Sequence, residues 1–161
     1  MGRIYMIPYT GTVTNAGGNV DLLETLPAST KPISLRGMLL SQISEVGDSA
    51  EEGLSLEIIR MTATVTGSNG TAVTPVPVKS LASTAATFTA EANGATVATT
   101  SGTSTIMADI GWNIRNSPFD FWFPDESFAP GAVNAEGLFV RQLTTAADDY
   151  TGCFTFWVEE S

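Results

Sequence analysis

The sequence contains no histidine and only one cysteine, Cys153. Without histidine, neither a Ser-His-Asp triad nor a Cys-His pair can form, and the usual histidine-ligated zinc sites are excluded. One cysteine allows no disulfide within the chain, and because Cys153 follows an apolar strand pattern beside Phe154 we expect a buried, unreactive thiol. Phosphate-binding loops of the GxxxxGK[ST] and GxGxxG types are also absent. The sequence therefore predicts a protein that is not an enzyme and holds no cofactor or metal.

Charged residues are scarce as well. They make up 15% of the chain, against about 25% in an average globular protein. The seven basic residues are scattered and the formal net charge is −10. Nucleic acids and anionic membranes bind clustered lysine and arginine, so we expect neither as a partner. A weakly charged surface rich in Thr, Ser and Ala is typical of a protein that packs against other chains, although a merely polar, soluble surface has the same composition.

Long apolar runs are missing too. The chain has no stretch of 18 apolar residues, and its first residues, MGRIYMIPY, form no apolar signal region. We therefore expect synthesis in a host cytoplasm without a classical secretion signal. With 161 residues, of which 43% are hydrophobic, the chain is long enough for a core of its own, and we expect one domain over residues 1–161.

Strand-forming residues, separated by turn residues at short intervals, dominate what is present. The strands expected from apolar alternation and apolar runs span residues 4–13, 20–25, 33–45, 54–65, 106–114, 138–143 and 153–159. Pro8 favours an edge position or a bulge in the first strand, whose two apolar faces suggest cover on both sides. Arg60 suggests a bulge in the fourth strand. Alternating βα units are absent. The sequence predicts an all-β protein: an antiparallel β-sandwich of about eight to ten strands, with jelly-roll topology ahead of an immunoglobulin-like one.

Two Asn-Gly pairs give the strongest local signals. Asn69-Gly70 and Asn93-Gly94 both lie between segments rich in Val, Thr and Phe. Asn and Gly tolerate the positive φ of a type I′ turn, so two β-hairpins are expected. Residues 83–92 could instead form a short Ala-rich helix. Asn69-Gly70-Thr71 also matches a glycosylation acceptor, but the missing signal region favours the turn.

Acidic residues are the remaining groups with possible chemistry. Asp120, Asp125 and Glu126 lie beside aromatic residues, as in many sugar-processing clefts, but their proximity in sequence does not establish the paired geometry that a glycosidase needs. Solvated loop carboxylates are the favoured interpretation. Two other acidic loops could coordinate a hard cation, although neither has EF-hand spacing and solvated loops are again favoured: Asp48, Glu51 and Glu52 in one, Asp148 and Asp149 in the other.

Six of the fourteen aromatic residues fall between Trp112 and Phe128. In an extended chain Phe119, Phe121 and Phe123 share one face, which we expect to be core. The opposite face presents an outward tryptophan near prolines, as in many interface anchors. The alternative is that this tryptophan closes the end of the sandwich. The predicted partner-contact residues are Trp122, Asp120, Pro124 and Phe128.

Four segments carry a likeness to a known family: MIPYTGTVTN (6–15), GWNIRNSPF (111–119), LFVRQLTT (138–145) and GCFTFWVEE (152–160). Together they resemble small virion structural proteins of tailed phages and prophages, especially jelly-roll capsid decoration proteins. The resemblance implies a place on the outer surface of the virion, binding to the major capsid protein or another virion protein, and no catalysis. It also implies a homo-oligomer, with a trimer favoured.

Two other functions stay open. One is a carbohydrate- or receptor-binding β-sandwich of a phage tail, in which Trp122 and Trp112 stack on a sugar and nearby acids bind its hydroxyl groups. The other is a carboxylate-driven glycan hydrolase or lyase that uses Asp120 and Asp125.

Overall fold

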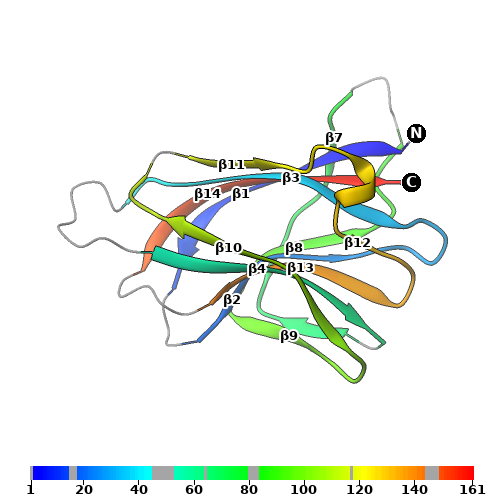
Figure 1. Ribbon diagram of the computed structural model, residues 1–161, viewed down its shortest axis with the longest axis horizontal. Coiled ribbons are helices and arrows are strands. Elements are labelled where there is room, and N and C mark those ends of the chain that lie inside the picture. Colours follow the sequence, from blue (N-terminus) through cyan, green and yellow to red (C-terminus); the bar gives the residue numbers. More distant parts are fainter. Residues whose placement is uncertain are drawn as a thin grey trace.

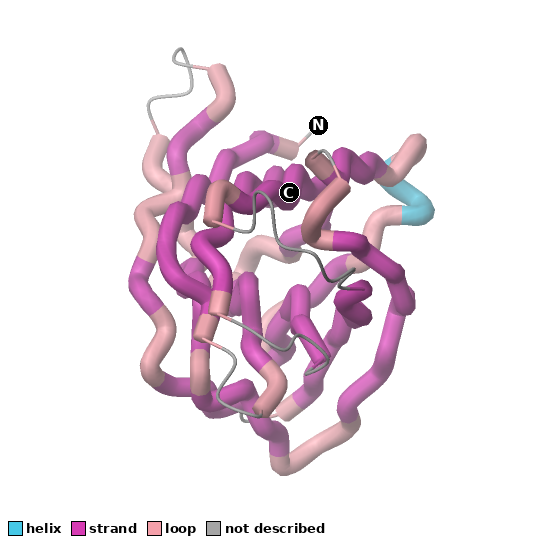
Figure 2. Tube along the Cα trace, turned by 90° about the vertical axis from the view of Figure 1, so that its left-hand side faces the viewer, coloured by secondary structure: helices cyan, strands magenta, loops and turns pink. Residues whose placement is uncertain are grey.

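The computed structural model describes residues 2–14, 18–44, 53–63, 65–79, 84–116, 118–143 and 149–161. In these ranges the chain forms fourteen strands and one short 3-10 helix, which lies at the rim of the molecule (Figures 1 and 2). No helix in these ranges is long and apolar enough to span a membrane. The elements are β1 (Arg3–Val13), β2 (Val20–Leu26), β3 (Ile33–Gln42), β4 (Gly53–Thr62), β5 (Val65–Ser68), β6 (Thr71–Ala72), β7 (Val76–Pro77), β8 (Thr89–Gly94), β9 (Thr96–Thr100), β10 (Ser104–Asn113), β11 (Phe119–Trp122), η1 (Glu126–Phe128), β12 (Gly131–Ala132), β13 (Glu136–Leu143) and β14 (Tyr150–Glu160).

Two six-stranded sheets pack face to face as a β-sandwich with jelly-roll topology. Sheet A has the order β11-β3-β14-β1-β7, with β12 also paired to β3, and sheet B has the order β10-β4-β13-β2-β8-β6. The strands of the jelly roll pair first with last: β1 with β14, β2 with β13, β3 with β11 and β4 with β10. All of these pairings are antiparallel. In Figure 1 sheet A lies above sheet B and the two termini lie side by side. The predicted β-sandwich is confirmed.

The expected number of strands was too low. Eight strands form the jelly roll, namely β1–β4, β10, β11, β13 and β14. Among the described residues there are six more, β5–β9 and β12, each two to six residues long. Four of them, β5, β6, β8 and β9, lie in the segments around the two Asn-Gly pairs, where strands were expected. The other two, β7 and β12, have two residues each and are too short to show alternation.

The first strand has its core on one side only. Tyr5 and Ile7 are fully buried, whereas Ile4 and Pro8 are exposed. The idea that both sides of β1 are covered is therefore wrong. The edge position predicted from Pro8 is confirmed, because among the described strands β7 pairs with β1 only at Tyr5 and Met6. Proline has no backbone N–H to donate, and an edge needs none.

The fourth strand keeps a regular alternation with both faces covered. Ile58 lies in the main core, and Ile59 lies in a second cluster on the outer face of sheet B. Adjacent side chains in a strand point to opposite faces, so no bulge is needed to bury both. The bulge expected near Arg60 is on the neighbouring strand: the register between β10 and β4 shifts between Ile106 and Ala108.

The two Asn-Gly pairs adopt the expected backbone but close no hairpin. Asn69 and Asn93 have φ values of 64° and 57°. However, β5 pairs with β9 and β6 pairs with β8, so residues 65–72 run antiparallel to residues 89–100. The two pairs therefore lie opposite each other at the corner where this ribbon passes from the two-stranded sheet into sheet B. The helix considered for 83–92 is also absent from its described part, where β8 begins at Thr89.

A buried ion pair connects sheet B to the two-stranded sheet of β5 and β9. The Nε atom of Arg141 on β13 donates to Asp21 Oδ1 at 2.6 Å, and its Nη2 atom donates to the Ala98 carbonyl of β9 at 2.9 Å. The Ala98 backbone N–H donates in turn to Asp21 Oδ2 at 2.6 Å. The two charged side chains are 1% (Asp21) and 11% (Arg141) exposed. This closed ring of charge-assisted hydrogen bonds fixes β9 over sheet B.

Arg141→Met should lower the free energy of unfolding by about 3–5 kcal/mol, because it leaves the Asp21 carboxylate buried without its cation. Chemical denaturation followed by tryptophan fluorescence measures this loss. Adding Asp21→Leu should recover part of the stability, because no buried charge is then left alone. A loss below about 1 kcal/mol in the single variant, the size typical of exposed pairs, would show that the pair is not an anchor.

Candidate functional site

The outer face of sheet A carries a row of apolar side chains that crosses five strands. Strand pairing places Trp122 of β11 beside Gly37 of β3, and Gly37 beside Trp157 of β14. It then places Trp157 beside Met6 of β1, and Met6 beside Val76 of β7. Residues directly opposite in antiparallel strands have their side chains on the same face. We call these five residues the aromatic row.

Gly37 allows the two tryptophans of the row to touch. The ring centroids of Trp122 and Trp157 are 4.6 Å apart, with the ring planes tilted by 37°. A Cβ atom on Gly37 would lie 2.7 Å from Cδ2 and Cε3 of Trp122, so the indole occupies the space above the glycine. Trp122 remains 48% exposed despite this contact. The pair therefore presents aromatic surface to solvent over β11, β3 and β14.

The predicted faces of the aromatic block are confirmed. The four predicted contact residues, Asp120, Trp122, Pro124 and Phe128, are all exposed, and Phe128 is the most exposed large apolar residue described, at 71%. The three phenylalanines, Phe119, Phe121 and Phe123, pack against the main core. Trp122 thus lies on a sheet face and does not close the end of the sandwich. Contact with a partner stays a prediction for all four residues.

Two other aromatic residues differ from expectation. Trp112 is 3% exposed and packs edge-on against Tyr150 at a centroid distance of 6.1 Å, so it belongs to the core and offers no sugar-stacking surface. Trp157 was missed. The alternation of β14 would have identified it, because Phe154 and Phe156 are buried and Trp157 is only half-buried.

The same alternation corrects the prediction for Cys153. Its side chain is half-buried on the outer face of sheet A, where the Thr10 hydroxyl donates to its sulfur at 3.7 Å. The expectation of a buried thiol is wrong because Cys153 is out of phase with Phe154, which faces the core.

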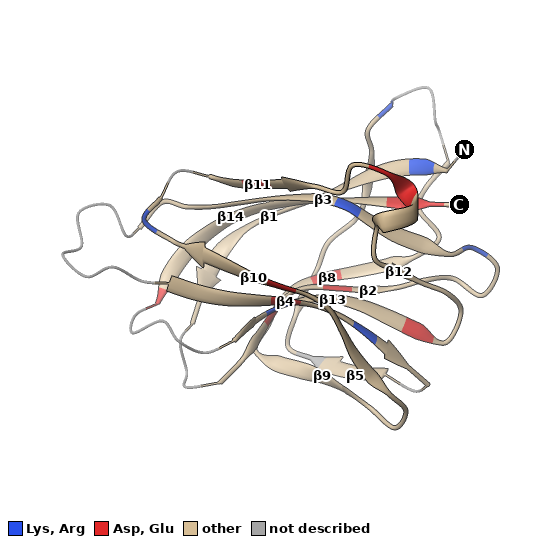
Figure 3. Cartoon of the chain, viewed as in Figure 1, with Lys and Arg blue, Asp and Glu red and all other residues tan. Residues whose placement is uncertain are grey.

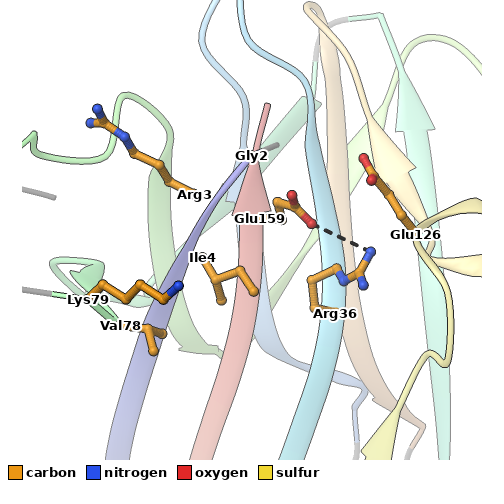
Figure 4. Close-up of a pocket in the computed structure, with 8 residues that line it drawn as sticks. All are labelled: Gly2, Arg3, Ile4, Arg36, Val78, Lys79, Glu126 and Glu159. Carbon is orange, nitrogen blue, oxygen red and sulfur yellow. Dashed lines mark ion pairs between the residues drawn. The ribbon is translucent and has the colours of Figure 1, made fainter.

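A cavity of about 380 Å³ adjoins the aromatic row at the end of sheet A that holds both termini. Ile4 and Val78 form its apolar wall (Figure 4). At its centre Arg36 Nη1 lies 3.5 Å from Glu159 Oε2. Nη1 is buried and has no hydrogen-bond partner among the described residues. The cavity thus contains a hydrogen-bond donor that nothing in the described chain satisfies.

Charges of opposite sign flank this central ion pair. Figure 4 shows Arg3 and Lys79 on one side of it and Glu126 on the other. None of these three has an ion-pair partner in the described parts of the chain. The strands of sheet A contain five charged residues in their described parts. Four of them lie at the end of the sheet that holds the cavity, namely Arg3, Arg36, Glu159 and Glu160, and Asp120 lies away from it (Figure 3).

Asp125 serves as the N-cap of η1. The backbone N–H and the hydroxyl group of Ser127 donate to Asp125 Oδ1 at 2.8 and 2.7 Å. These hydrogen bonds hold the pKa of Asp125 below its ordinary value. A glycosidase general acid needs a raised pKa, so Asp125 does not fit that role.

A second group of charges lies on the outer face of sheet B. Burial first, and then the nearby Asp21 and Glu91 carboxylates, raise the pKa of Glu24 to about 7, against a lowering effect of Arg141. The Glu24 carboxylate occupies the space that a side chain on Gly67 of β5 would need.

No set of three or more His, Cys, Asp or Glu side chains is placed to hold a metal ion in the described ranges. Four residues considered for cation binding, Asp48, Glu51, Glu52 and Asp148, lie outside those ranges.

Comparisons of the chain with protein-family models, with curated proteins and with solved structures gave no match. The fold and the site define it as an antiparallel jelly roll with an exposed aromatic row on one sheet.

Glu24→Gln should remove a pH dependence of stability. Glutamate has a pKa near 4.5 when unfolded and about 7 in the fold, so the folded state holds the proton more tightly. The stabilisation that protonated Glu24 contributes to the fold is complete below pH 4.5 and is lost as the pH rises to 7. The variant should be more stable than the parent at pH 8 by about 1–2 kcal/mol, allowing for partial solvent exposure. Urea denaturation at pH 5 and pH 8 measures the free energy of unfolding, with Asp120→Asn on the other sheet as control. An equal change of this free energy with pH in the parent and in Glu24→Gln would contradict the prediction.

Gly37→Ala should push Trp122 off Trp157 without unfolding the protein. The added methyl group overlaps the indole ring, which can swing outward because Trp122 is on the surface. The expected result is a loss of the exciton signal of the tryptophan pair in circular dichroism. Gly111→Ala is the matched control, since a Cβ there meets nothing within 4 Å. An unchanged signal in Gly37→Ala would show that the two rings do not interact.

Proposed function

We propose that this protein is a non-enzymatic structural subunit of a viral particle, which associates with copies of itself and binds the outer capsid lattice. The aromatic row on the outer face of sheet A is the single observation that carries the proposal. Its chemistry is that of a protein-binding surface, built on rigid strands and supplied with two tryptophans.

The surroundings of the row support this function. Val78 and Ile4 are 45% and 36% exposed, and with Val76 of the row, which is 45% exposed, they extend the apolar surface at the β7 end. Contiguous exposed apolar surface commonly marks an interaction site, and tryptophan is enriched among the residues that dominate binding energy. An indole pair held on the strands of one sheet loses little conformational freedom when a partner covers it.

A capsid exterior suits the charge of the chain. A net charge of −10 disfavours contact with packaged nucleic acid, and an outer surface imposes no such conflict. A repeating lattice also strengthens weak contacts, since a self-associated unit engages several sites at once. Self-association and lattice binding therefore reinforce each other in this proposal.

Trp122→Ala should weaken self-association at least about 30-fold, the effect of losing a residue worth about 2 kcal/mol or more at an interface. It should leave the fold intact, because the side chain lies outside the core. Size-exclusion chromatography with light scattering measures association, and cosedimentation with viral particles measures lattice binding.

Ile106→Ala is the matched control: Ile106 is 53% exposed on β10, at the edge of sheet B. It should leave association unchanged. A parent protein that stays monomeric at high concentration and does not cosediment with particles would contradict the proposed function.

A second candidate function, carbohydrate binding by a tail protein, is favoured by one observation. The Trp122–Trp157 pair offers exposed aromatic surface beside a cavity that contains Arg36 and Glu126. Glycan-array binding, together with a change in tryptophan fluorescence that Trp122→Ala abolishes, would support it. A blank array with unchanged fluorescence would remove it.

A further inference from the structure

We infer that the outer face of sheet A binds the same face of a second copy of this chain, about a two-fold axis parallel to the strands and between β3 and β14. The inference rests on the proposed function and deepens it, because it names the partner and the surface. It leaves other surfaces free to bind the lattice.

The apolar part of the face complements itself under this operation. Rotation by 180° about an axis along the strands leaves the position of each residue along the strand direction unchanged. It reverses the order of the strands across the sheet. Trp122 on β11 is then placed over the Met6 region of β1 in the second copy, and the reverse contact forms at the same time. Both are members of the aromatic row, which lies at one level across all five strands. An isologous interface requires this kind of self-matching patch.

The charges match under the same operation. Arg36 on β3 and Glu159 on β14 exchange places, so the central ion pair of one copy lies over that of the other in reversed order. Glu126, on the β11 side of the cavity, comes to face Lys79 on the β7 side. The face is thus acidic on one flank and basic on the other, and the rotation brings opposite flanks together. Complementary charges of this kind select the partner and its orientation.

The second copy fits this face better than a sugar does. A chain with net charge −10 repels its own copies over most of its surface. Two of the seven basic residues, Arg3 and Lys79, line the cavity beside the aromatic row and have no ion-pair partner among the described residues. Their charge offsets the repulsion where the copies would meet. A bound sugar would contact the indole surface, but sugar binding does not account for the two flanks of opposite charge.

Two charge reversals test the pairing directly. In a dimer of Lys79→Glu both symmetric contacts would join two carboxylates, and in a dimer of Glu126→Lys both would join two ammonium groups. Each variant alone should dimerise at least about tenfold more weakly than the parent at low salt. A 1:1 mixture of the two should recover dimers, because both contacts of a mixed dimer join opposite charges. Light scattering measures the molar mass in all three samples, and Asp109→Lys on β10 serves as a charge-reversal control.

Recovery in the mixture supports the two-fold contact, since a mere folding defect in either variant would not be repaired by the other. A parent dimer that both reversals leave intact would place the contact elsewhere and overturn the inference. A parent trimer, the state that the family resemblance implies, would overturn it as well, because a cyclic trimer joins two different surfaces. Glycan binding by a monomeric parent would assign the face to a sugar. The proposed function is judged separately by cosedimentation of the parent protein with particles.

Discussion

The pairing of the first strand with the last is the constraint on which the rest of the fold depends. β1 and β14 pair over eleven residues, from Arg3 with Glu160 to Val13 with Tyr150. This contact closes nearly the whole chain into one loop, and the remaining strands wrap around it in antiparallel pairs. It also fixes which side chains face outward. A shift of one residue in either strand would move its side chains to the other face, and would exchange Trp157 for the neighbouring Phe156 or Val158 of the core.

The two sheets differ in how their outer faces are covered. On sheet B the β5–β9 pair packs over Ile59 and Phe139, and the buried Asp21–Arg141 ion pair fixes it there. On the outer face of sheet A no described strand or helix covers the aromatic row, and Trp122 is about half exposed. The difference explains why an apolar surface of similar kind is core on one side of the molecule and a candidate interface on the other.

Alternation in the sequence was enough to predict the fold class and much of the site. It placed Phe119, Phe121 and Phe123 inward and Trp122 outward, because strand geometry alone decides which face a side chain takes. It could not show that Trp157 of a distant segment would meet Trp122, since strand order depends on long-range pairing. It also could not show that the Asn-Gly pairs mark the corner of a ribbon. Their positive φ is a local property, whereas the choice of β9 as the partner of β5 is not. The cavity escaped prediction for the same reason, because Arg36, Val78 and Glu126 are far apart in sequence.

The central claim is that the outer face of sheet A is a surface for assembly. Hydroxyl-radical footprinting at low and high protein concentration tests it within one sample, because methionine and tryptophan react readily when exposed. The account predicts that oxidation of Met6, Trp122 and Trp157 falls as the protein associates. Oxidation of Met107, which is 39% exposed on β10 of the other sheet, should stay the same. Protection of Met107 with no change at Trp122 would contradict the account.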